Sequence, residues 1–332
     1  MTYVKGRIWW QQDTDRFFAK AGRAGYSAGT MRILVAALGL LLLLAAPASA
    51  SDRLDLVPRV AVISAYEPEW TVLKASVGEA TSHHANGVEF VTGTLAGRSV
   101  VLFLSGVGPV NAAMTTQLAL GRFDVTAIVV SGVAGGADPG LRVGDVVVAG
   151  RWGQYLDAVF ARETDGKFHP PAGFATPYAN FGMIFPTELG VRRSGSATEQ
   201  RFWFEADPGM LAAAGRIGAV DLRRCTADRR CLGHAPRLIV GGNGVSGPAF
   251  VDNAAFRQYV FGTFEAQVLD MESAAVAMVA YANRVPFIAF RSLSDLAGGD
   301  GGANELHTFF QLASDNSAAV VRRFLTLWTP PR

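Results

Sequence analysis

Asp270-Met271-Glu272-Ser273-Ala274-Ala275 ends one apolar run and begins an Ala-rich helical pattern, and Arg291-Ser292-Leu293-Ser294-Asp295 ends the next apolar run. In both segments an acidic residue stands where a strand is expected to end. In an open α/β sheet, substrates bind in the crevice beyond the carboxyl ends of the strands. We therefore expect Glu272 and Asp295 to face a ligand and to handle both a proton and a developing positive charge.

Short apolar runs alternate with helical patterns along the chain. The predicted strands, which read as strands covered on both faces, are Val60–Ala65, Val100–Leu104, Ala127–Val130, Asp145–Ala149, Leu238–Val240 and Phe287–Phe290. The predicted helices are Trp70–Val77, Val110–Leu120, Glu272–Ala282 and Leu306–Leu327. Strands separated by helices predict an α/β fold, a three-layer α/β/α sandwich with a mixed, mainly parallel, twisted central sheet.

One region interrupts this alternation. Between Phe160 and Glu205 the sequence is rich in Pro, Gly and aromatic residues, and we interpret it as a long irregular excursion packed over one end of the sheet. No Pro/Ser-rich linker or internal repeat divides the chain. We therefore expect residues 51–332 to form a single domain with an irregular insertion at about 160–235.

Residues 31–50 have the pattern of a secretory signal peptide. A charged start at Met31-Arg32 is followed by an apolar stretch through Leu44 and by Pro47-Ala48-Ser49-Ala50. The apolar run is short for a bilayer span, so cleavage is favoured over anchorage. We expect an exported, periplasmic mature chain that begins near Ser51 and keeps no stable membrane anchor; an uncleaved anchor is the alternative. Residues 1–30 fit a start codon assigned too early, or a disordered extension, better than a domain.

The charge of the expected mature chain is close to neutral. The whole chain has 30 basic and 28 acidic residues, and without residues 1–50 these counts become 24 and 26. The net charge thus changes from +2 to −2. A nearly neutral body has no electrostatic footprint for nucleic acid, so we predict no nucleic-acid partner.

Cys225 and Cys231 lie in a polar, Arg-rich loop. In an exported protein, two thiols at this spacing favour a small surface disulfide, with free thiols as the alternative. A metal site would have to add His234 and would still have three ligands in a loop, so we predict no metal.

Three predicted turns follow strands and carry polar or glycine residues. The first, Tyr66-Glu67-Pro68-Glu69, places two acids where a lone one would only complement a helix dipole. The others, Ser105-Gly106-Val107-Gly108 and Ser131–Gly136, let backbone N–H groups approach an anion or a sugar hydroxyl. The third departs from the six-residue dinucleotide fingerprint, so nicotinamide is not expected and we predict no cofactor.

Five motifs occur in the order found in the nucleoside phosphorylase and nucleosidase superfamily. Besides the two segments quoted first they are Ser105–Gly108, Val130–Gly136 and Leu141-Arg142-Val143-Gly144-Asp145-Val146-Val147. The chain most resembles the methylthioadenosine/S-adenosylhomocysteine nucleosidases, from about Val60 to the C-terminus. The resemblance implies a nucleoside phosphorylase-like domain and a homodimer. The insertion departs from the compact bacterial enzymes and resembles exported bacterial relatives and plant bark storage proteins.

The resemblance also implies roles for individual residues. Asp295 would protonate the purine at N7, Glu69 would activate water, and Glu272 would hold the ribose hydroxyls. Arg291, as a catalytic residue, and Ser105, as a substrate-binding residue, would help to fix the nucleophile. The other implied substrate-binding residues are Gly106, Gly135, Ser294, Met271 against the sugar, Phe250 stacked on the base, and Val251, whose backbone would read the base edge.

The same chemistry follows from the residue types. Breaking an N-glycosidic bond builds oxocarbenium character on the ribose, which a carboxylate such as Glu272 stabilises, and the purine leaves as a neutral base only if it is protonated. Asp295 must then stay protonated near neutral pH, as burial allows. The alternatives are a helix-capping role for Asp295 after Leu296 and a core position for Met271.

Water or phosphate as the second substrate defines the enzyme class. A phosphorylase needs an Arg or Lys in the first or second turn to hold phosphate, and neither turn has one. We therefore predict a nucleoside hydrolase. Arg291 keeps a phosphorylase open as the alternative, and a non-catalytic binding or storage protein is the third. Pro68 leaves open whether Glu69 or, with the turn shifted by two positions, Glu67 is the base.

Overall fold

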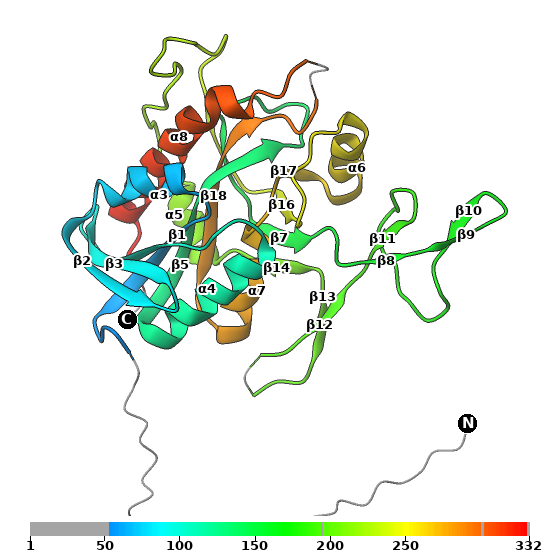
Figure 1. Cartoon of the computed structure of the whole chain (residues 1–332), viewed down its shortest axis with the longest axis horizontal. Helices are drawn as coiled ribbons and strands as arrows, with labels where there is room; N and C mark the ends of the chain where they lie inside the picture. The colour runs from blue at the N-terminus through cyan, green and yellow to red at the C-terminus, as the bar shows by residue number, and fades with distance from the viewer. Residues whose placement is uncertain (1–52, 194, 300–301, 331–332) are drawn as a thin grey trace, which may run out of the picture. The chain divides into compact units, whose positions relative to one another are not determined.

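A twisted mixed β-sheet forms the centre of the protein (Figure 1). The computed structural model describes residues 53–193, 195–299 and 302–330, so the predicted signal peptide and the extension before it lie outside the described residues. The strands of the main path, in spatial order, are β14 (Trp203–Glu205), β7 (Arg151–Gln154), β16 (Asn243–Ser246), β17 (Ala266–Asp270), β5 (Asp124–Gly136), β1 (Pro58–Ser64), β4 (Arg98–Leu104), β3 (Val88–Leu95) and β2 (Gly78–Ala85).

Strand β18 (Phe287–Asp295) also pairs in parallel with β5, so β5 contacts both halves of the sheet. β6 (Val146–Val148) pairs antiparallel with β18, and β15 (Leu238–Val240) pairs in parallel with β6. The central order β4-β1-β5-β18 is parallel throughout. The carboxyl ends of β1, β5 and β18 therefore meet at one edge of the sheet.

Successive side chains of a strand point to opposite faces of the sheet. Because both sets are apolar here, each face is covered by a layer of helices. In β1, Ala61 and Ile63 belong to the core under α4 (Pro109–Arg122) and α7 (Ser273–Asn283), whereas Val60 and Val62 belong to the opposite core. That second core lies under α3 (Glu67–Lys74), α5 (Pro208–Ala214) and α8 (Leu306–Leu327). The predicted three-layer sandwich is confirmed. A further helix, α6 (Ala254–Phe264), packs beside β17.

The segment Ser131–Gly136 is not a turn as predicted. It continues β5, pairing with Phe290–Asp295 of β18 on one side and, at Gly135 and Gly136, with β17 on the other. The small residues serve close packing: a Cβ on Gly132 would lie 2.5 Å from Arg291 Nη1. Helix α3 begins at Glu67 rather than near Trp70, since Pro68 is tolerated in the first turn of a helix.

The insertion is more regular than the sequence indicates. β8 (Ala158–Phe160) pairs with β11 (Ile184–Pro186), β9 (Arg162–Thr164) with β10 (Lys167–His169), and β12 (Leu189–Val191) with β13 (Glu199–Arg201). Figure 1 shows that the β9–β10 pair projects away from the sheet instead of packing over its end. Asp165 and Gly166 adopt positive φ angles of 52° and 72°, as a two-residue hairpin turn requires.

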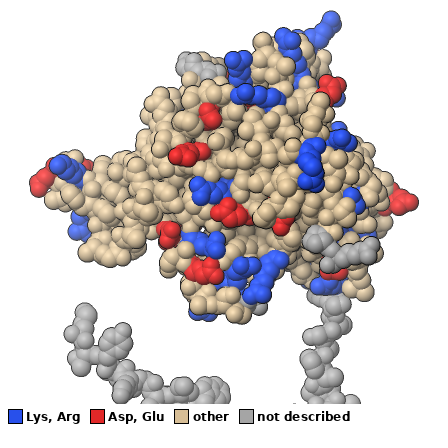
Figure 2. All heavy atoms as spheres, turned by 180° about the vertical axis from the view of Figure 1, so that it is seen from behind, with Lys and Arg blue, Asp and Glu red and all other residues tan. Residues whose placement is uncertain are grey.

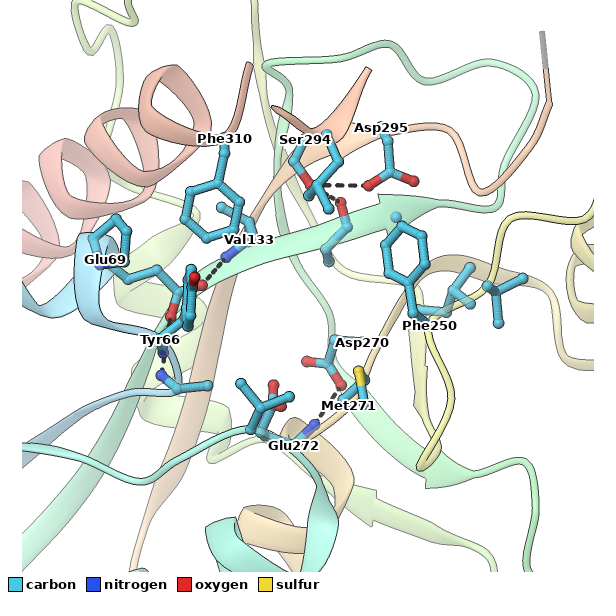
Figure 3. A pocket seen from close by; sticks show the side chains of 18 of the residues that line it. Tyr66, Glu69, Val133, Phe250, Asp270, Met271, Glu272, Ser294, Asp295 and Phe310 are labelled. Carbon is cyan, nitrogen blue, oxygen red and sulfur yellow. Dashed lines mark hydrogen bonds between the residues drawn. The ribbon is translucent and has the colours of Figure 1, made fainter. Parts of the chain in front are cut away.

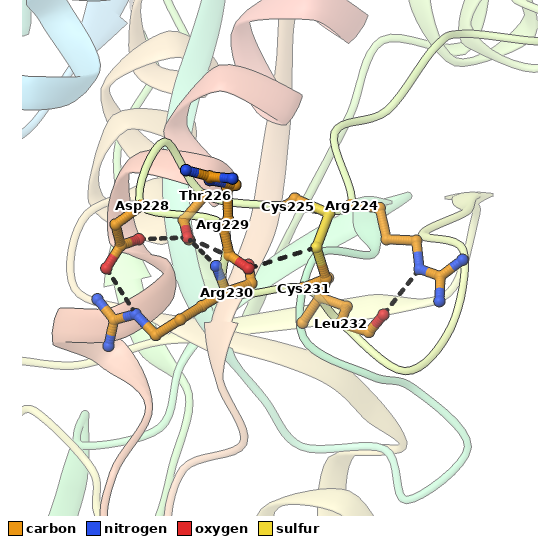
Figure 4. Close-up of a disulfide and its surroundings, with 8 residues drawn as sticks. All are labelled: Arg224, Cys225, Thr226, Asp228, Arg229, Arg230, Cys231 and Leu232. Carbon is orange, nitrogen blue, oxygen red and sulfur yellow. Dashed lines mark hydrogen bonds and ion pairs between the residues drawn. A yellow bond between two sulfur atoms is a disulfide. The ribbon is translucent and has the colours of Figure 1, made fainter.

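Cys225 and Cys231 form a disulfide, as the sequence predicts (Figure 4). His234 Nε2 lies 2.9 Å from the Val143 carbonyl oxygen. Arg230 Nη1 donates to Thr308 Oγ1 at 3.1 Å, which ties the disulfide loop to the first turn of α8.

The surface carries both signs of charge. On the face shown in Figure 2, Lys and Arg are interspersed with Asp and Glu, and much of the area between them is uncharged. No helix among the described residues is long and apolar enough to cross a membrane.

Candidate active site

A cavity of about 630 Å³ opens where the carboxyl ends of the central strands meet (Figure 3). Its walls come from segments far apart in the sequence, at the starts of α3, α7 and α8 and the ends of β5, β17 and β18. The lining residues are Ala65, Tyr66, Pro68, Glu69, Val107, Val133, Ala134, Gly135, Ala249, Phe250, Val251, Leu269, Asp270, Met271, Glu272, Ser294, Asp295, Leu306, His307 and Phe310. Among them the acids predicted from sequence, Glu69, Glu272 and Asp295, come together.

Glu69 is held in place by backbone amides from two elements. Its Oε2 accepts from Ala65 N at 2.9 Å and Tyr66 N at 3.1 Å, so it caps the helix on which it stands. Its Oε1 accepts from Val133 N of β5 at 2.8 Å. Glu67, the alternative base, does not line the cavity. The structure therefore brings Glu69, and not Glu67, to the site.

Arg291 lies beneath the cavity and is fully buried. Its Nε is 2.7 Å from Asp270 Oδ2 and donates to Ser273 Oγ at 3.0 Å. Its Nη2 donates to Glu272 Oε2 at 3.2 Å, and its Nη1 to the Val133 carbonyl oxygen at 3.3 Å. Every nitrogen of the guanidinium thus has a partner within the protein, and the group does not line the cavity.

Glu272 precedes α7 and reaches into the cavity from below in Figure 3. Its Oε1 accepts from Gly108 N at 2.9 Å, which ties it to the glycine turn before α4. Burial raises the pKa of Glu272 to about 7; Arg291 opposes this shift, whereas Asp270 and Glu69 add to it. A carboxylate in this position favours a positive charge in the cavity beside it.

Asp295 stands across the cavity from Glu69, on the same side as Phe250 (Figure 3). It is the last residue of β18 and only 2% exposed. Its Oδ1 accepts from Ala297 N at 2.8 Å, and its Oδ2 accepts from Ser294 Oγ at 3.0 Å. Burial raises the pKa of Asp295, against these hydrogen bonds, which extends the pH range in which this group can donate a proton. Residues 297–299 form a turn and α8 begins only at Leu306, so Asp295 does not cap a helix directly after Leu296 and the helix-capping alternative is wrong.

Burial likewise raises the pKa of Glu69, although Arg291 and three backbone amides oppose it. Two acidic groups thus face each other across the cavity, both more basic than free carboxylates. Such a pair is suited to acid and base roles near neutral pH.

Gly135, Phe250, Val251, Met271 and Ser294 all line the cavity as predicted. Phe250 is 54% exposed and offers its ring at the cavity wall, and Met271 faces the cavity rather than the core.

Ser105 and Gly106 do not line the cavity. Ser105 Oγ donates to the Gly106 carbonyl oxygen at 2.9 Å, which turns the hydroxyl into its own loop. The next residue, Val107, takes the place on the wall. A glycine turn indicates that backbone can approach a ligand closely, but it does not indicate which residue of the turn does so.

Sequence analysis missed the wall that α8 provides. Leu306, His307 and Phe310 line the cavity from the first turn of this helix, and Tyr66 meets Phe310 edge to face with ring centroids 5.4 Å apart. One signal was available in the sequence, since Phe309 and Phe310 are adjacent. Only one of them can lie on the buried face of the helix, as Phe309 does, so the other was a candidate for a second apolar surface. Among the described residues, no cluster of His, Cys, Asp or Glu is arranged to hold a metal.

Comparison with known proteins gives a consistent result. The 5′-methylthioadenosine/S-adenosylhomocysteine nucleosidase of Geobacillus thermodenitrificans is 30% identical over 270 residues, covering 81% of this chain and 97% of the relative. That of Bacillus licheniformis is 29% identical over 268 residues, covering 80% and 98%. The crystal structure of the Neisseria meningitidis nucleosidase in complex with methylthio-immucillin-A has a TM-score of 0.61 at 25% identity, over 81% of this chain and 99% of that one.

The matched region contains the whole cavity. Residues 59–326 match the family model described as the phosphorylase superfamily, and every cavity-lining residue falls within this range. The match covers most of the chain, and the fold and the order of the motifs agree with it. The chain belongs to the phosphorylase superfamily.

Proposed function

We propose that this protein hydrolyses the N-glycosidic bond of a purine nucleoside of the methylthioadenosine, S-adenosylhomocysteine or adenosine type, releasing the free base and the ribose moiety. The observation that carries the proposal is that Glu69, Glu272 and Asp295 line one cavity whose wall has no Lys or Arg among the described residues. This chain matches two relatives over nearly their whole length, and both are named for this reaction.

The positions of the three acids suit the two halves of the reaction. Asp295, whose pKa burial raises, lies on the Phe250 side and would protonate the purine as it leaves. Glu69, on the opposite side, would take a proton from the attacking water. Glu272 would bind the ribose hydroxyls, and its negative charge would stabilise the oxocarbenium charge on the ribose. Phe250 would stack on the base, Met271 would contact the sugar, and the Val251 backbone would read the base edge.

The charges around the cavity favour water over phosphate. A phosphate dianion requires an accessible cation, commonly a bidentate arginine. Arg291 was the candidate from sequence, but its guanidinium is fully buried and engaged by Asp270, Glu272, Ser273 and Val133. Glu69 would in addition repel phosphate from the place where it would attack.

The test is base release from methylthioadenosine or adenosine by the purified protein in phosphate-free buffer, with Asp295→Asn as the variant. We expect the wild type to release adenine and the variant to lose about 10²–10⁴-fold in kcat, since asparagine can accept the Ala297 amide but cannot donate the acid proton. Release that requires added phosphate would make the protein a phosphorylase. A folded wild type inactive under both conditions would indicate a binding or storage protein.

We further propose that the protein acts outside the cytoplasm, after cleavage of its leader near Ser51, and as a homodimer. The exposed apolar side chains of Val110 and Met114 on α4 support the second point. N-terminal sequencing of the exported protein and sedimentation analysis of the purified protein test these statements.

A further inference from the structure

Asp270 stands behind the three acids, with its side chain 1% exposed. It ends β17 and its carboxylate faces two elements at once, the start of α7 and the guanidinium of Arg291 on β18. Nothing in the reaction proposed above uses this carboxylate.

The first oxygen of Asp270 caps helix α7. Oδ1 accepts from Glu272 N and from Ser273 N, each at 3.2 Å, and from the hydroxyl of Ser246. Ser246 Oγ in turn accepts from Ala274 N at 2.8 Å. Amides in the first turn of a helix have no partner within the helix, and a carboxylate there also suits the helix dipole. Because Asp270 fills this role, the neighbouring Glu272 makes no side-chain cap and its carboxylate is left to face the cavity.

The second oxygen of Asp270 fixes the arginine. Oδ2 lies 2.7 Å from Arg291 Nε, and both side chains are buried. Nε donates to Ser273 Oγ, so its contact with Asp270 is an ion pair and not a hydrogen bond. This ion pair holds one edge of the guanidinium, while Nη2 donates to Glu272 and Nη1 to the Val133 carbonyl oxygen. The orientation of Glu272 thus depends on Asp270 through both α7 and Arg291, whereas Glu69 is held by backbone amides.

The charge count adds a second effect. One buried cation, Arg291, faces the three carboxylates of Glu69, Asp270 and Glu272. Without Asp270, the cation would be balanced by the two cavity-facing glutamates alone, and the site would be less favourable for a positive charge on the ribose.

We propose that Asp270 is the positioning residue of this site: its one carboxylate caps α7 so that Glu272 faces the substrate, and it neutralises Arg291 so that the cavity stabilises a cation instead of binding an anion. The inference rests on the nucleosidase function proposed above and adds a residue that acts through Glu272 and Arg291 without touching the reacting atoms.

The decisive variant is Asp270→Asn, which retains an oxygen to cap α7 and loses the charge. We expect kcat to fall by roughly tenfold or more with a smaller change in KM, because the lost charge stabilises the transition state more than the neutral substrate. The groups facing Glu272 are Arg291 from β18, Asp270 from β17, Glu69 from α3 and the Gly108 amide. Since the Asp270 charge raises the pKa of Glu272, the acid limb of the rate profile should move by about one unit to lower pH.

Asp145→Asn is the matched control. Asp145 is also buried, at 2% exposure, accepts from Arg142 N and Arg237 N at 3.1 and 2.9 Å, and lies 3.6 Å from an arginine nitrogen, but it does not line the cavity. We expect it to lose stability while kcat and the acid limb stay as in the wild type.

A folded Asp270→Asn with wild-type kcat and an unmoved acid limb would overturn the inference. A similar fall in kcat and a similar shift of the acid limb in the Asp145→Asn control would overturn it as well. Infrared spectroscopy of the protonated carboxyl group, with Glu272→Gln as the reference for assignment, follows the titration of Glu272 without turnover. Its midpoint should fall in Asp270→Asn, and an unchanged midpoint would contradict the proposal. A wild type that releases no base would instead refute the proposed function, so the two failures are distinguishable.

Discussion

Glu272 shows most clearly how a functional side chain opposes stability at the level of a single residue. Burial raises its pKa from an ordinary 4.5 to about 7. A group whose pKa is raised by folding contributes its stability below the unfolded pKa and loses it as the pH rises to the folded pKa. The ionised form of Glu272, which would stabilise a cation on the ribose, is therefore the form that lowers the free energy of unfolding.

We expect Glu272→Gln to gain stability relative to the wild type as the pH rises from 5 to 8, by on the order of 3 kcal/mol at most, because glutamine does not ionise. The same variant should lose about 10²-fold or more in kcat. Thermal unfolding of both proteins at the two pH values gives the first number and steady-state kinetics the second. Glu67→Gln, outside the cavity, is the control, and an equal stability difference at both pH values would contradict the prediction.

Residue identities predicted the acids of the site better than its hydroxyl and amide groups. Glu69, Glu272 and Asp295 could be found because a carboxylate at a strand end has few structural reasons to be there. The sequence did not show which residue of the glycine turn lines the cavity, because the rotation of such a turn depends on contacts such as that between Gly108 and Glu272, which are distant in sequence. The engagement of Arg291 by Asp270 was equally invisible, because it depends on the pairing of β17 and β18 with β5.

At the scale of one element, β5 explains why small residues follow the apolar part of the strand. A Cβ on Gly132 would lie 2.5 Å from Arg291 Nη1 and 2.6 Å from Glu69 Oε1. The same run of small residues favours a turn when it is seen in sequence alone. The strand continues because both of its edges are paired, by β18 and β17.

Gly132→Ala should therefore reduce kcat by about 10²-fold or more, since a displacement of catalytic groups by 1 Å has this effect. Gly121→Ala is the matched control, because its added Cβ meets no atom within 4 Å and an alanine in a helix is favoured by about 1 kcal/mol. Kinetics and thermal unfolding of the two variants check the contrast. Full activity in Gly132→Ala would mean that the buried charges can move without consequence.

The disulfide loop is a second element whose contribution can be isolated. Removing Cys225 and Cys231 together by substitution to serine should lower the free energy of unfolding by roughly 2 kcal/mol, the loop entropy of so short a ring. None of the loop residues lines the cavity, so kcat well below the melting temperature should be retained. Melting curves with and without reductant test this: the reductant should lower the melting temperature of the wild type and leave that of the variant unchanged.

At the scale of the whole molecule, the insertion and the catalytic cavity are separate. Among the described residues from 137 to 248, none lines the cavity. The alternation of strands and helices was predictable because each element buries an apolar face in one of two cores. Strand β2 and the hairpins of the insertion were not predictable, because a largely exposed strand such as Gly78–Ala85 has no apolar run.

Deletion of residues 162–169 should leave kcat/KM within about threefold of the wild type, because the removed hairpin has exposed sides and its ends already lie together, with Arg162 paired to His169. Kinetics and circular dichroism of the shortened protein check this. A large loss of activity in a folded product would assign the hairpin a part in catalysis or assembly.

The edge-to-face contact between Tyr66 and Phe310 joins the opening and closing stretches of the folded domain across the mouth of the cavity. A growing chain that has been synthesised as far as Asp295 already carries every acid of the site, yet it has neither the outer wall nor Ser317, whose hydroxyl accepts from the Gly132 amide. Catalysis must therefore await the final helix. We therefore expect a chain shortened before α8 to lack activity, although it contains all three acids.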